Sequence, residues 1–321
     1  MTESDRRFLR GSGQRVGVDV AVSPPQLVRG STPTPWGKVS YLTWGDGPVR
    51  IVAAHGGGQN AHTWDPVAIA LARPLVAIDL PGHGHSDWRP DRNYLPAANA
   101  QTLARVMDEL ELQAVTYVGM SLGGLTGIAL ASQRPDLVRR LILVDVTPGV
   151  RSTFDNLSDS QLGASTLVGG RRVFASREEM VDASVAALPA RSRESLEIGV
   201  HHNSRQNPDG TWTWRYDSLV GHSASQYLKL WDSLADFPGD VMLVRGGDSA
   251  FVSEEDVATL VSVRPDVRMA VIQGAGHSVQ GDKPRELADV VAGFAENSTT
   301  EPRLSAAGSL GRRTGLGISP R

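Results

Sequence analysis

The stretch AVTYVGMSLGGLTGIAL, residues 114–130, decides the fold. Its first half is apolar and rich in β-branched and aromatic residues, which is typical of a buried strand. Its second half holds small and apolar residues at helical spacing, and GMSLG, residues 119–123, lies between the two halves. A strand that runs directly into a helix leaves a turn so tight that the flanking positions need glycine. The stretch therefore predicts a nucleophile elbow with Ser121 as the nucleophile.

Length, charge and composition restrict the kinds of protein that fit. The 321 residues, 40% of them hydrophobic, suffice for one large α/β domain with an insertion or for two domains. A net charge of −3 and scattered arginines argue against a nucleic-acid partner. The chain has no cysteine, which excludes disulfides, thiol catalysis and thiolate metal sites.

The two ends of the chain differ from its middle. Residues 1–14 are polar and charged, so we expect a flexible N-terminus without a secretory signal. Residues 297–321 are rich in Ser, Gly, Arg and Pro and lack apolar periodicity, so we expect a disordered tail. No apolar run approaches the length of a membrane span, and the default expectation is a cytoplasmic protein.

Segments typical of strands and helices alternate along the middle of the chain, which predicts a mostly parallel sheet with helices on both faces. The expected strands are residues 16–22, 39–44, 50–54, 75–79, 115–120, 141–146, 241–246 and 267–273. The expected helices are residues 103–112, 122–133, 254–263 and 284–296.

A long interval interrupts this alternation. Residues 15–146 and 238–296 would form the α/β core, and residues 147–237, which are polar and mostly helical, would be inserted as a cap over the ends of the strands. Within the insertion, residues 207–210 predict a hairpin turn before Trp212.

Three candidate catalytic residues follow predicted strands. Ser121 follows one strand, Asp248 the strand in MLVRGGDS, and His277 the strand in MAVIQGAGHS. In open α/β sheets the residues just past the carboxyl ends of the strands share one crevice, so these side chains should meet. The backbone N–H groups of Leu122 and Gly57 are the expected oxyanion hole.

The chain resembles the α/β-hydrolase superfamily, in the cap-bearing group of esterases, lactonases and carbon–carbon bond hydrolases. The resemblance extends from about Val39 to Phe294. Besides the elbow it rests on HGGG at 55–58, DLPGHGHS at 79–86, RGGDS at 245–249 and GAGHS at 274–278. It implies the α/β-hydrolase fold and a triad in the chain order Ser, Asp, His.

The identity of the triad acid has two candidates. We favour Asp248, which occupies the usual position of the acid in the superfamily. Asp145 also follows an apolar strand, and in this superfamily the carboxylate can come from that earlier strand end.

Several histidines outside the triad have a metal-binding alternative. His83 and His85 lie near Asp79, and His201 is adjacent to His202. We favour structural roles for them, because DLPGHGHS resembles a turn that ties loops together in this superfamily and adjacent helical histidines chelate poorly. His55 is expected to support the oxyanion loop.

The resemblance implies acyl transfer through a covalent intermediate on Ser121, without a metal or organic cofactor, acting on a partly apolar small molecule. Hydrolysis of a carboxylic ester is the leading hypothesis. The alternatives are carbon–carbon bond hydrolysis or lactone opening with the same triad, and a ligand-binding protein that turns over slowly. The sequence does not indicate the oligomeric state.

The expected cap would determine the substrate. An arginine that faces the pocket would favour a substrate with a carboxylate, whereas arginines on the outside would only form a solvated surface. The candidates are Arg171, Arg172, Arg191, Arg193 and Arg205.

Overall fold

The computed structural model describes residues 3–21, 25–150, 172–189, 191–217 and 227–296. The expected C-terminal tail and Arg171 lie outside these residues. Eight strands form the central sheet in the order β1-β2-β4-β3-β5-β6-β10-β11. Their bounds are β1 Leu27–Thr34, β2 Gly37–Trp44, β3 Ile51–Ala54, β4 Leu75–Ile78, β5 Val115–Met120, β6 Val138–Val144, β10 Asp240–Gly246 and β11 Arg268–Ile272.

The sheet is parallel from β4 to β11 and antiparallel only at the edge formed by β1 and β2. The central strands β3, β4 and β5 are buried along their whole length, as expected for a parallel sheet covered on both faces. The parallel order brings the carboxyl ends of β3, β4, β5, β6, β10 and β11 to the same edge.

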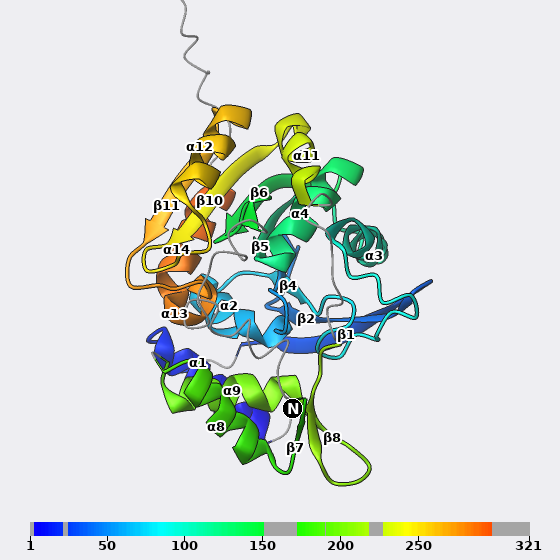
Figure 1. Cartoon of the computed structure of the whole chain (residues 1–321), viewed down its shortest axis with the longest axis vertical. Helices are drawn as coiled ribbons and strands as arrows, with labels where there is room; N and C mark the ends of the chain where they lie inside the picture. Colours follow the sequence, from blue (N-terminus) through cyan, green and yellow to red (C-terminus); the bar gives the residue numbers. More distant parts are fainter. Residues whose placement is uncertain (1–2, 22–24, 151–171, 190, 218–226, 297–321) are drawn as a thin grey trace, which may run out of the picture.

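Helices cover both faces of this sheet (Figure 1). Four helices belong to the apolar layer on one face: α3 Pro96–Glu109, α4 Leu122–Gln133, α11 Leu230–Asp236 and α12 Glu254–Val263. The helices α2 Asp65–Leu71 and α14 Pro284–Glu296 pack on the other face. Two short elements, the 3-10 helix η1 Ala61–Trp64 and α13 Val279–Asp282, precede α2 and α14. The predicted α/β architecture is confirmed.

Two elements lie in places that the sequence did not predict. Residues 3–14, expected to be flexible, belong to helix α1 Glu3–Arg15, because Phe8 and Leu9 are buried against the rest of the protein. The strand expected at residues 16–22 is wrong, since turns follow α1 there, and the edge strand β1 was missed.

Residues 172–189 and 191–217, in the segment between β6 and β10, form a small separate layer. It contains β7 Val173–Phe174, α8 Arg177–Ala187, α9 Arg193–Asn203, β8 Ser204–Gln206 and β9 Trp212–Trp214. β8 and β9 pair antiparallel across the predicted turn, in which Gly210 has φ +85°. In Figure 1 this layer lies with α1 beside the sheet. We call residues 172–189 and 191–217 the inserted layer.

Helix α11, which falls inside the range predicted as insertion, packs instead on the core. Its residues Leu230 and Leu234 are buried in the same apolar layer as α4. The inserted layer therefore ends before α11.

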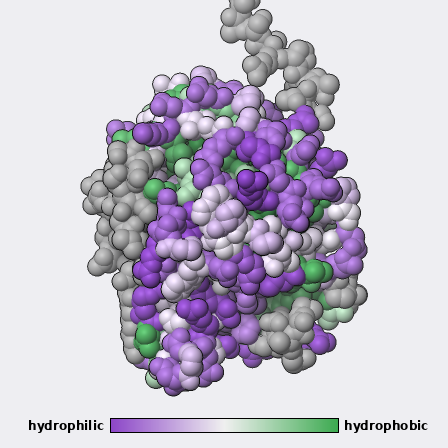
Figure 2. All heavy atoms as spheres, turned by 90° about the vertical axis from the view of Figure 1, so that its right-hand side faces the viewer, coloured by the Kyte–Doolittle hydropathy of each residue, from purple (hydrophilic) through white to green (hydrophobic). Residues whose placement is uncertain are grey.

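The surface contrasts with these apolar layers. The face seen in Figure 2 is mostly hydrophilic, with hydrophobic residues in small separate areas. Among the described residues, no helix combines the length and the hydropathy needed to cross a membrane.

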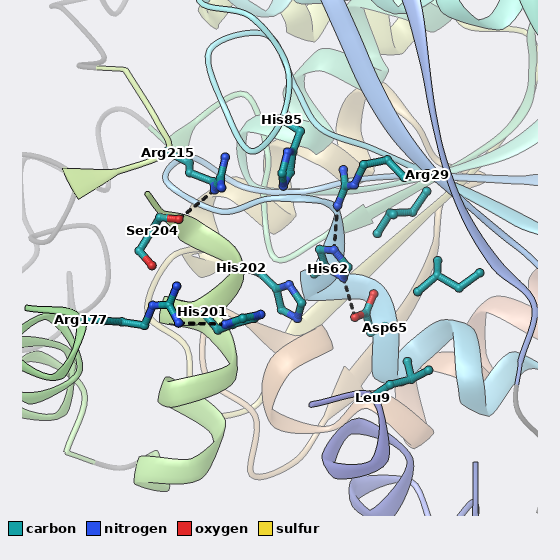
Figure 3. Close-up of a pocket in the computed structure, with 12 residues that line it drawn as sticks. Leu9, Arg29, His62, Asp65, His85, Arg177, His201, His202, Ser204 and Arg215 are labelled. Atoms are coloured by element: carbon teal, nitrogen blue, oxygen red, sulfur yellow. Dashed lines mark hydrogen bonds and ion pairs between the residues drawn. The ribbon is translucent and has the colours of Figure 1, made fainter. Parts of the chain in front are cut away.

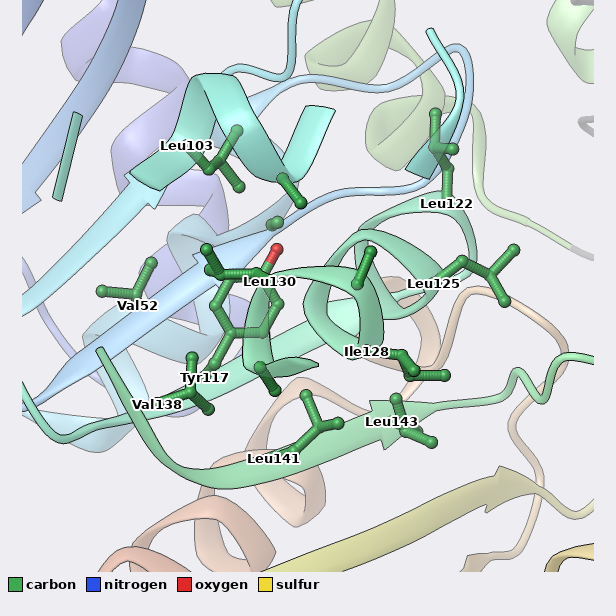
Figure 4. Packing of buried hydrophobic residues seen from close by; sticks show 14 of the residues in the cluster. Val52, Leu103, Tyr117, Leu122, Leu125, Ile128, Leu130, Val138, Leu141 and Leu143 are labelled. Atoms are coloured by element: carbon green, nitrogen blue, oxygen red, sulfur yellow. The ribbon is translucent and has the colours of Figure 1, made fainter. Parts of the chain in front are cut away.

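The packing of α4 on the sheet generates a prediction about stability. Leu130 is fully buried beside Tyr117 and Leu141 (Figure 4). We expect Leu130→Ala to lower the free energy of unfolding by about 2–5 kcal/mol, because it removes buried methyl groups and leaves a cavity. Urea unfolding followed by circular dichroism measures this change. The matched control is Leu228→Ala, whose leucine is 56% exposed, and a similar loss in both variants would contradict the packing described.

Candidate active site

Ser121 occupies a strained turn between β5 and α4. Its backbone has φ 49° and ψ −117°, a conformation that residues other than glycine rarely adopt. The flanking glycines are needed for steric reasons. A Cβ atom on Gly119 would lie 2.4 Å from the carbonyl oxygen of Gly123, and one on Gly123 would lie 2.3 Å from that of Ala54. The predicted elbow is therefore present in the structure.

His277 follows β11 and is held by a carboxylate and an aromatic ring. Its Nδ1 lies 2.8 Å from Oδ2 of Asp145. The ring of Phe251 stacks on the imidazole, with 3.5 Å between the ring centroids and 9° between the planes. Because Nδ1 is bonded to a carboxylate, it carries the proton, and Nε2 is left as an acceptor.

Asp145 is buried at the end of β6, next to the elbow strand in the sheet. Besides His277, its carboxylate accepts hydrogen bonds from the backbone N–H of Gly246, at 3.0 Å, and from the hydroxyl of Ser249. The backbone of Asp145 is also strained, with φ 51°. On the elbow side, the N–H of Ser121 donates to the carbonyl of Val144, 3.3 Å away.

The structure brings Asp145, and not Asp248, to His277, which corrects the predicted choice of acid. Asp248 lies in an exposed turn after β10, with its backbone N–H donating to the carbonyl of Ala275. Nδ1 of His277 already contacts the carboxylate of Asp145. Within RGGDS, the residue that reaches this carboxylate is Ser249, which follows Asp248.

The predicted oxyanion loop lies against the elbow. A Cβ atom on Gly56 would be 3.2 Å from Cβ of Ser121. The N–H of Gly56 donates to Oε1 of Gln59, and the amide nitrogen of Gln59 donates to the hydroxyl of Ser278, next to His277. Within the described part of the chain, the N–H groups of Gly57 and Leu122 donate to no other residue. Both N–H groups are therefore available for the oxyanion role predicted from the sequence, which did not predict the contacts of Gln59.

His55 supports this loop, as predicted. Its Nε2 accepts a hydrogen bond from the N–H of Leu80, so Nδ1 carries the proton and donates to the carbonyl of Gly56. Burial, partly offset by Asp79, lowers the pKa of His55, which keeps the ring neutral. The neutral tautomer fits both hydrogen bonds.

Asp79 organises the loops after β3 and β4. Its buried carboxylate accepts from the N–H groups of Ala61 and His85 and pairs with Arg29 at 3.0 Å. Burial alone would raise the pKa of Asp79, but Arg29 and the backbone donors lower it below its usual value. This arrangement agrees with the structural role expected for DLPGHGHS.

The inserted layer is hydrogen-bonded to both loops of the site. The amide nitrogen of Asn203 at the end of α9 donates to the carbonyl of Gly58 in the oxyanion loop. Arg191 donates to the carboxylate of Asp282 at 2.8 and 3.0 Å, and that carboxylate accepts from the N–H of Gly276. The layer is thereby tied to the predicted oxyanion loop and to the loop that carries His277.

One group of side chains could hold a metal ion in the described part of the chain. One ligand atom from each of His62, Asp65 and His202 lies within 4.8 Å of the others. His202 belongs to a pair considered from the sequence, but His62 and Asp65 were missed, because an HxxD spacing is too common to single out. His83 and His85 do not belong to this group.

Comparisons with known proteins identify the family to which this chain belongs. The model of the alpha/beta hydrolase family matches residues 51–290. Esterase Rv0045c of Mycobacterium tuberculosis is 46% identical over 258 residues, which cover 80% of this chain and 86% of the esterase. A solved structure of that esterase, described with its inhibition by transition metals, superposes with a TM-score of 0.79 and 42% identity. It covers 90% of this chain and 98% of the esterase chain.

More distant relatives also match most of the chain. An sn-1-specific diacylglycerol lipase of Mus musculus is 28% identical over 255 residues, 76% of this chain and 80% of the lipase. The fold similarity thus extends well beyond the elbow.

The buried histidine of the DLPGHGHS turn generates a prediction about pH. Burial and the neighbouring His55 lower the pKa of His83 to about 3. Below pH 6.5 the unfolded chain therefore binds a proton that the folded chain does not, and stability falls by up to about 1.4 kcal/mol per pH unit. We expect a shallower loss in His83→Gln, whose side chain cannot be protonated. Urea unfolding at pH 7, 6 and 5 compares the two proteins, and equal slopes would contradict the buried neutral histidine.

Proposed function

Because the chain belongs to the alpha/beta hydrolase family, we propose that Ser121, His277 and Asp145 form the catalytic triad of this ester-cleaving enzyme. The observation that carries the proposal is the 2.8 Å contact between His277 and Asp145, at the same sheet edge as the strained Ser121. The identity of 46% to an esterase supports the reaction class.

The proposed reaction proceeds through an acyl-enzyme. Nε2 of His277 takes the proton of Ser121 as Oγ attacks the ester carbonyl, and Asp145 stabilises the imidazolium. The N–H groups of Gly57 and Leu122 bind the developing oxyanion, each contributing on the order of 10²- to 10³-fold. His277 returns its proton to the leaving alcohol. Water, deprotonated by the same histidine, then releases the acid and regenerates Ser121.

The inserted layer is proposed to act as the cap over this site. The hydrogen bond from Asn203 to Gly58 and the ion pair of Arg191 with Asp282 support this role. We propose that the substrate is a partly apolar small molecule and that the protein is cytoplasmic, the latter from sequence alone. Carbon–carbon bond hydrolysis, lactone opening and slow ligand binding remain alternatives that an activity screen distinguishes.

The proposed nucleophile gives the first prediction about activity. We expect Ser121→Ala to lose hydrolysis of short p-nitrophenyl esters, by up to about a millionfold in kcat, because no acyl-enzyme can form. Steady-state assays with purified protein measure the loss, and a fluorophosphonate probe should label the wild-type protein only. Retention of wild-type turnover by the alanine variant would refute the assignment.

The two candidate acids are separated by a matched pair of variants. We expect Asp145→Asn to lower kcat by about 10⁴-fold, because the amide no longer holds the correct tautomer of His277. Asp248→Asn should stay near the wild-type rate, since this residue lies exposed in its turn. Activity assays of both variants, with their thermal unfolding as a check on folding, decide between them. A larger loss in the Asp248 variant would restore the choice made from the sequence.

A further inference from the structure

A pocket lies between the edge strands β1 and β2 of the sheet and the inserted layer. Its volume is about 360 Å³. Basic and imidazole side chains reach it from several different elements, as Figure 3 shows. We call it the basic pocket and define it by Arg29, Arg177, Arg215, His62, His85 and His202.

Two of its arginines lack an acidic partner. Among the described residues, Arg215 donates through Nε to the carbonyl of Ser204 and Arg177 interacts with His201 and the ring of Trp212, but neither forms an ion pair with a carboxylate. Within the part of the chain that the structure describes, Nε of Arg177 is buried without a hydrogen-bond partner. Half-buried guanidinium groups without counter-charges are unfavourable, and an anion in the pocket would supply the missing charge.

The acidic groups near the pocket are already engaged. Asp79 pairs with Arg29, and Asp65 accepts a hydrogen bond from Nδ1 of His62. Among the described residues, the positive charges around this cavity therefore exceed the negative ones.

The titration of the lining groups agrees with a positive potential. Burial, followed by Arg205 and Arg29, lowers the pKa of Arg215. Partial burial, followed by Arg29 and Arg215, lowers the pKa of His85 to about 4. Each of these groups loses part of its affinity for a proton because other cations are close.

A metal ion fits the same place less well. The unpartnered Oδ1 of Asp65 could serve as a ligand. However, Nε2 of His62 accepts from Arg29 at 2.7 Å, and its Nδ1 donates to Asp65, so the ring offers no free lone pair. The rings of His62 and His202 are stacked, 3.7 Å apart and 15° from parallel, so their lone pairs do not converge on one ion.

The basic pocket adjoins a hollow that reaches the loops around the active site. His62 and His202 also line a neighbouring hollow of about 150 Å³, whose wall includes Gly58, Gln59 and Ser278. These residues belong to the oxyanion loop and to the loop that carries His277. The two hollows share His62 and His202, so a ligand that extends from the basic pocket toward these loops would pass between the core and the inserted layer at these two histidines.

The sheet order gives the scale of this connection. In the order β1-β2-β4-β3-β5, strand β4 is two strands and β1 four strands from the elbow strand. At about 4.8 Å per strand, β4 lies about 10 Å and β1 about 19 Å from β5. A substrate that reaches both sites needs a long spacer between its ester and its anionic group.

We propose that the basic pocket binds the carboxylate of an extended ester substrate whose acyl carbonyl lies at Ser121. Arg215, Arg29 and Arg177 hold the anion, and the apolar residues Leu9, Leu27 and Leu42 line the remaining wall. The proposal rests on the proposed function for the position of the ester, whereas the binding of the anion can be tested without catalysis.

Binding is measured by calorimetry on Ser121→Ala protein with sebacate, a long dicarboxylate, and separately with inorganic phosphate. We expect saturable binding of sebacate that weakens with added NaCl and falls roughly tenfold or more when Arg215→Gln is added. The control is Arg193→Gln, because Arg193 pairs with Glu178 and Asp182 on the outer surface of the inserted layer. Absence of sebacate binding, or equal binding with Arg215→Gln, overturns the proposal. Binding of phosphate alone would likewise contradict a carboxylate site, and so would preferential binding of Zn²⁺ in place of the anion.

Kinetics test whether the anion belongs to the substrate. We compare kcat/KM at low salt for two esters, mono-p-nitrophenyl sebacate and the neutral diester made by methylating its free carboxylate. We expect kcat/KM of the wild-type protein to be higher for the ester with the free carboxylate. Arg215→Gln should reduce this preference roughly tenfold, and Arg193→Gln should retain it. Comparing two esters within one variant separates recognition of the charge from a general loss of folded protein.

The outcomes distinguish the two proposals. If wild-type protein cleaves neither ester, the proposed function is refuted. The calorimetry still tests whether the basic pocket binds a carboxylate. If it cleaves both esters equally well, the proposed esterase activity is supported and the carboxylate site is refuted. Should Arg215→Gln fail to fold, Arg177→Gln removes a second arginine of the pocket and takes its place in both experiments.

Discussion

The carboxylate of Asp145 links the ends of three strands, β6, β10 and β11, through hydrogen bonds. It is buried after β6, accepts from the backbone of Gly246 at the end of β10, and binds His277 after β11. Because the N–H of Ser121 donates to the carbonyl just before Asp145, the elbow is attached to the same point. A buried carboxylate of this kind is stable only while its hydrogen bonds are made. The position of the histidine and the cohesion of the loops that carry it therefore depend on one group.

Backbone geometry imposes the second constraint. Ser121 and Asp145 both have positive φ, which the surrounding contacts must maintain at a cost of order 1–3 kcal/mol each. At the elbow, helix α4 and the end of β3 approach so closely that Gly123 leaves no space for a side chain. The same close approach places the oxyanion loop beside Ser121. The strain at Ser121 and its closeness to the predicted oxyanion loop are thus two results of one tight turn.

The sequence predicted the parts of the fold that local patterns determine. Residues 122–133, 254–263 and 284–296 are helices with the expected bounds, and a capping box of Ser253 and Asp256 marks the start of the second one. The carboxylate partner of His277 could not be predicted from such local patterns. Asp145 and Asp248 each follow an apolar strand, and only the tertiary structure decides that the loop after β10 presents Ser249 inward and Asp248 outward. Helix α1 was missed for a related reason, since Phe8 and Leu9 lie in a polar segment and are buried only by distant residues.

The inserted layer relates substrate recognition to the geometry of catalysis. Its arginines divide by position: Arg191 pairs with Asp282 next to the His277 loop, Arg193 lies on the outer surface, and Arg215 faces the basic pocket. Asn203, at the end of the helix that carries His202, is bonded to the carbonyl of Gly58 in the oxyanion loop. On the proposal made above, a ligand in the basic pocket would contact a helix that is also hydrogen-bonded to this loop. In this arrangement, binding energy gained far from the ester can help to hold the backbone donors where the oxyanion forms, which raises the rate as well as the affinity.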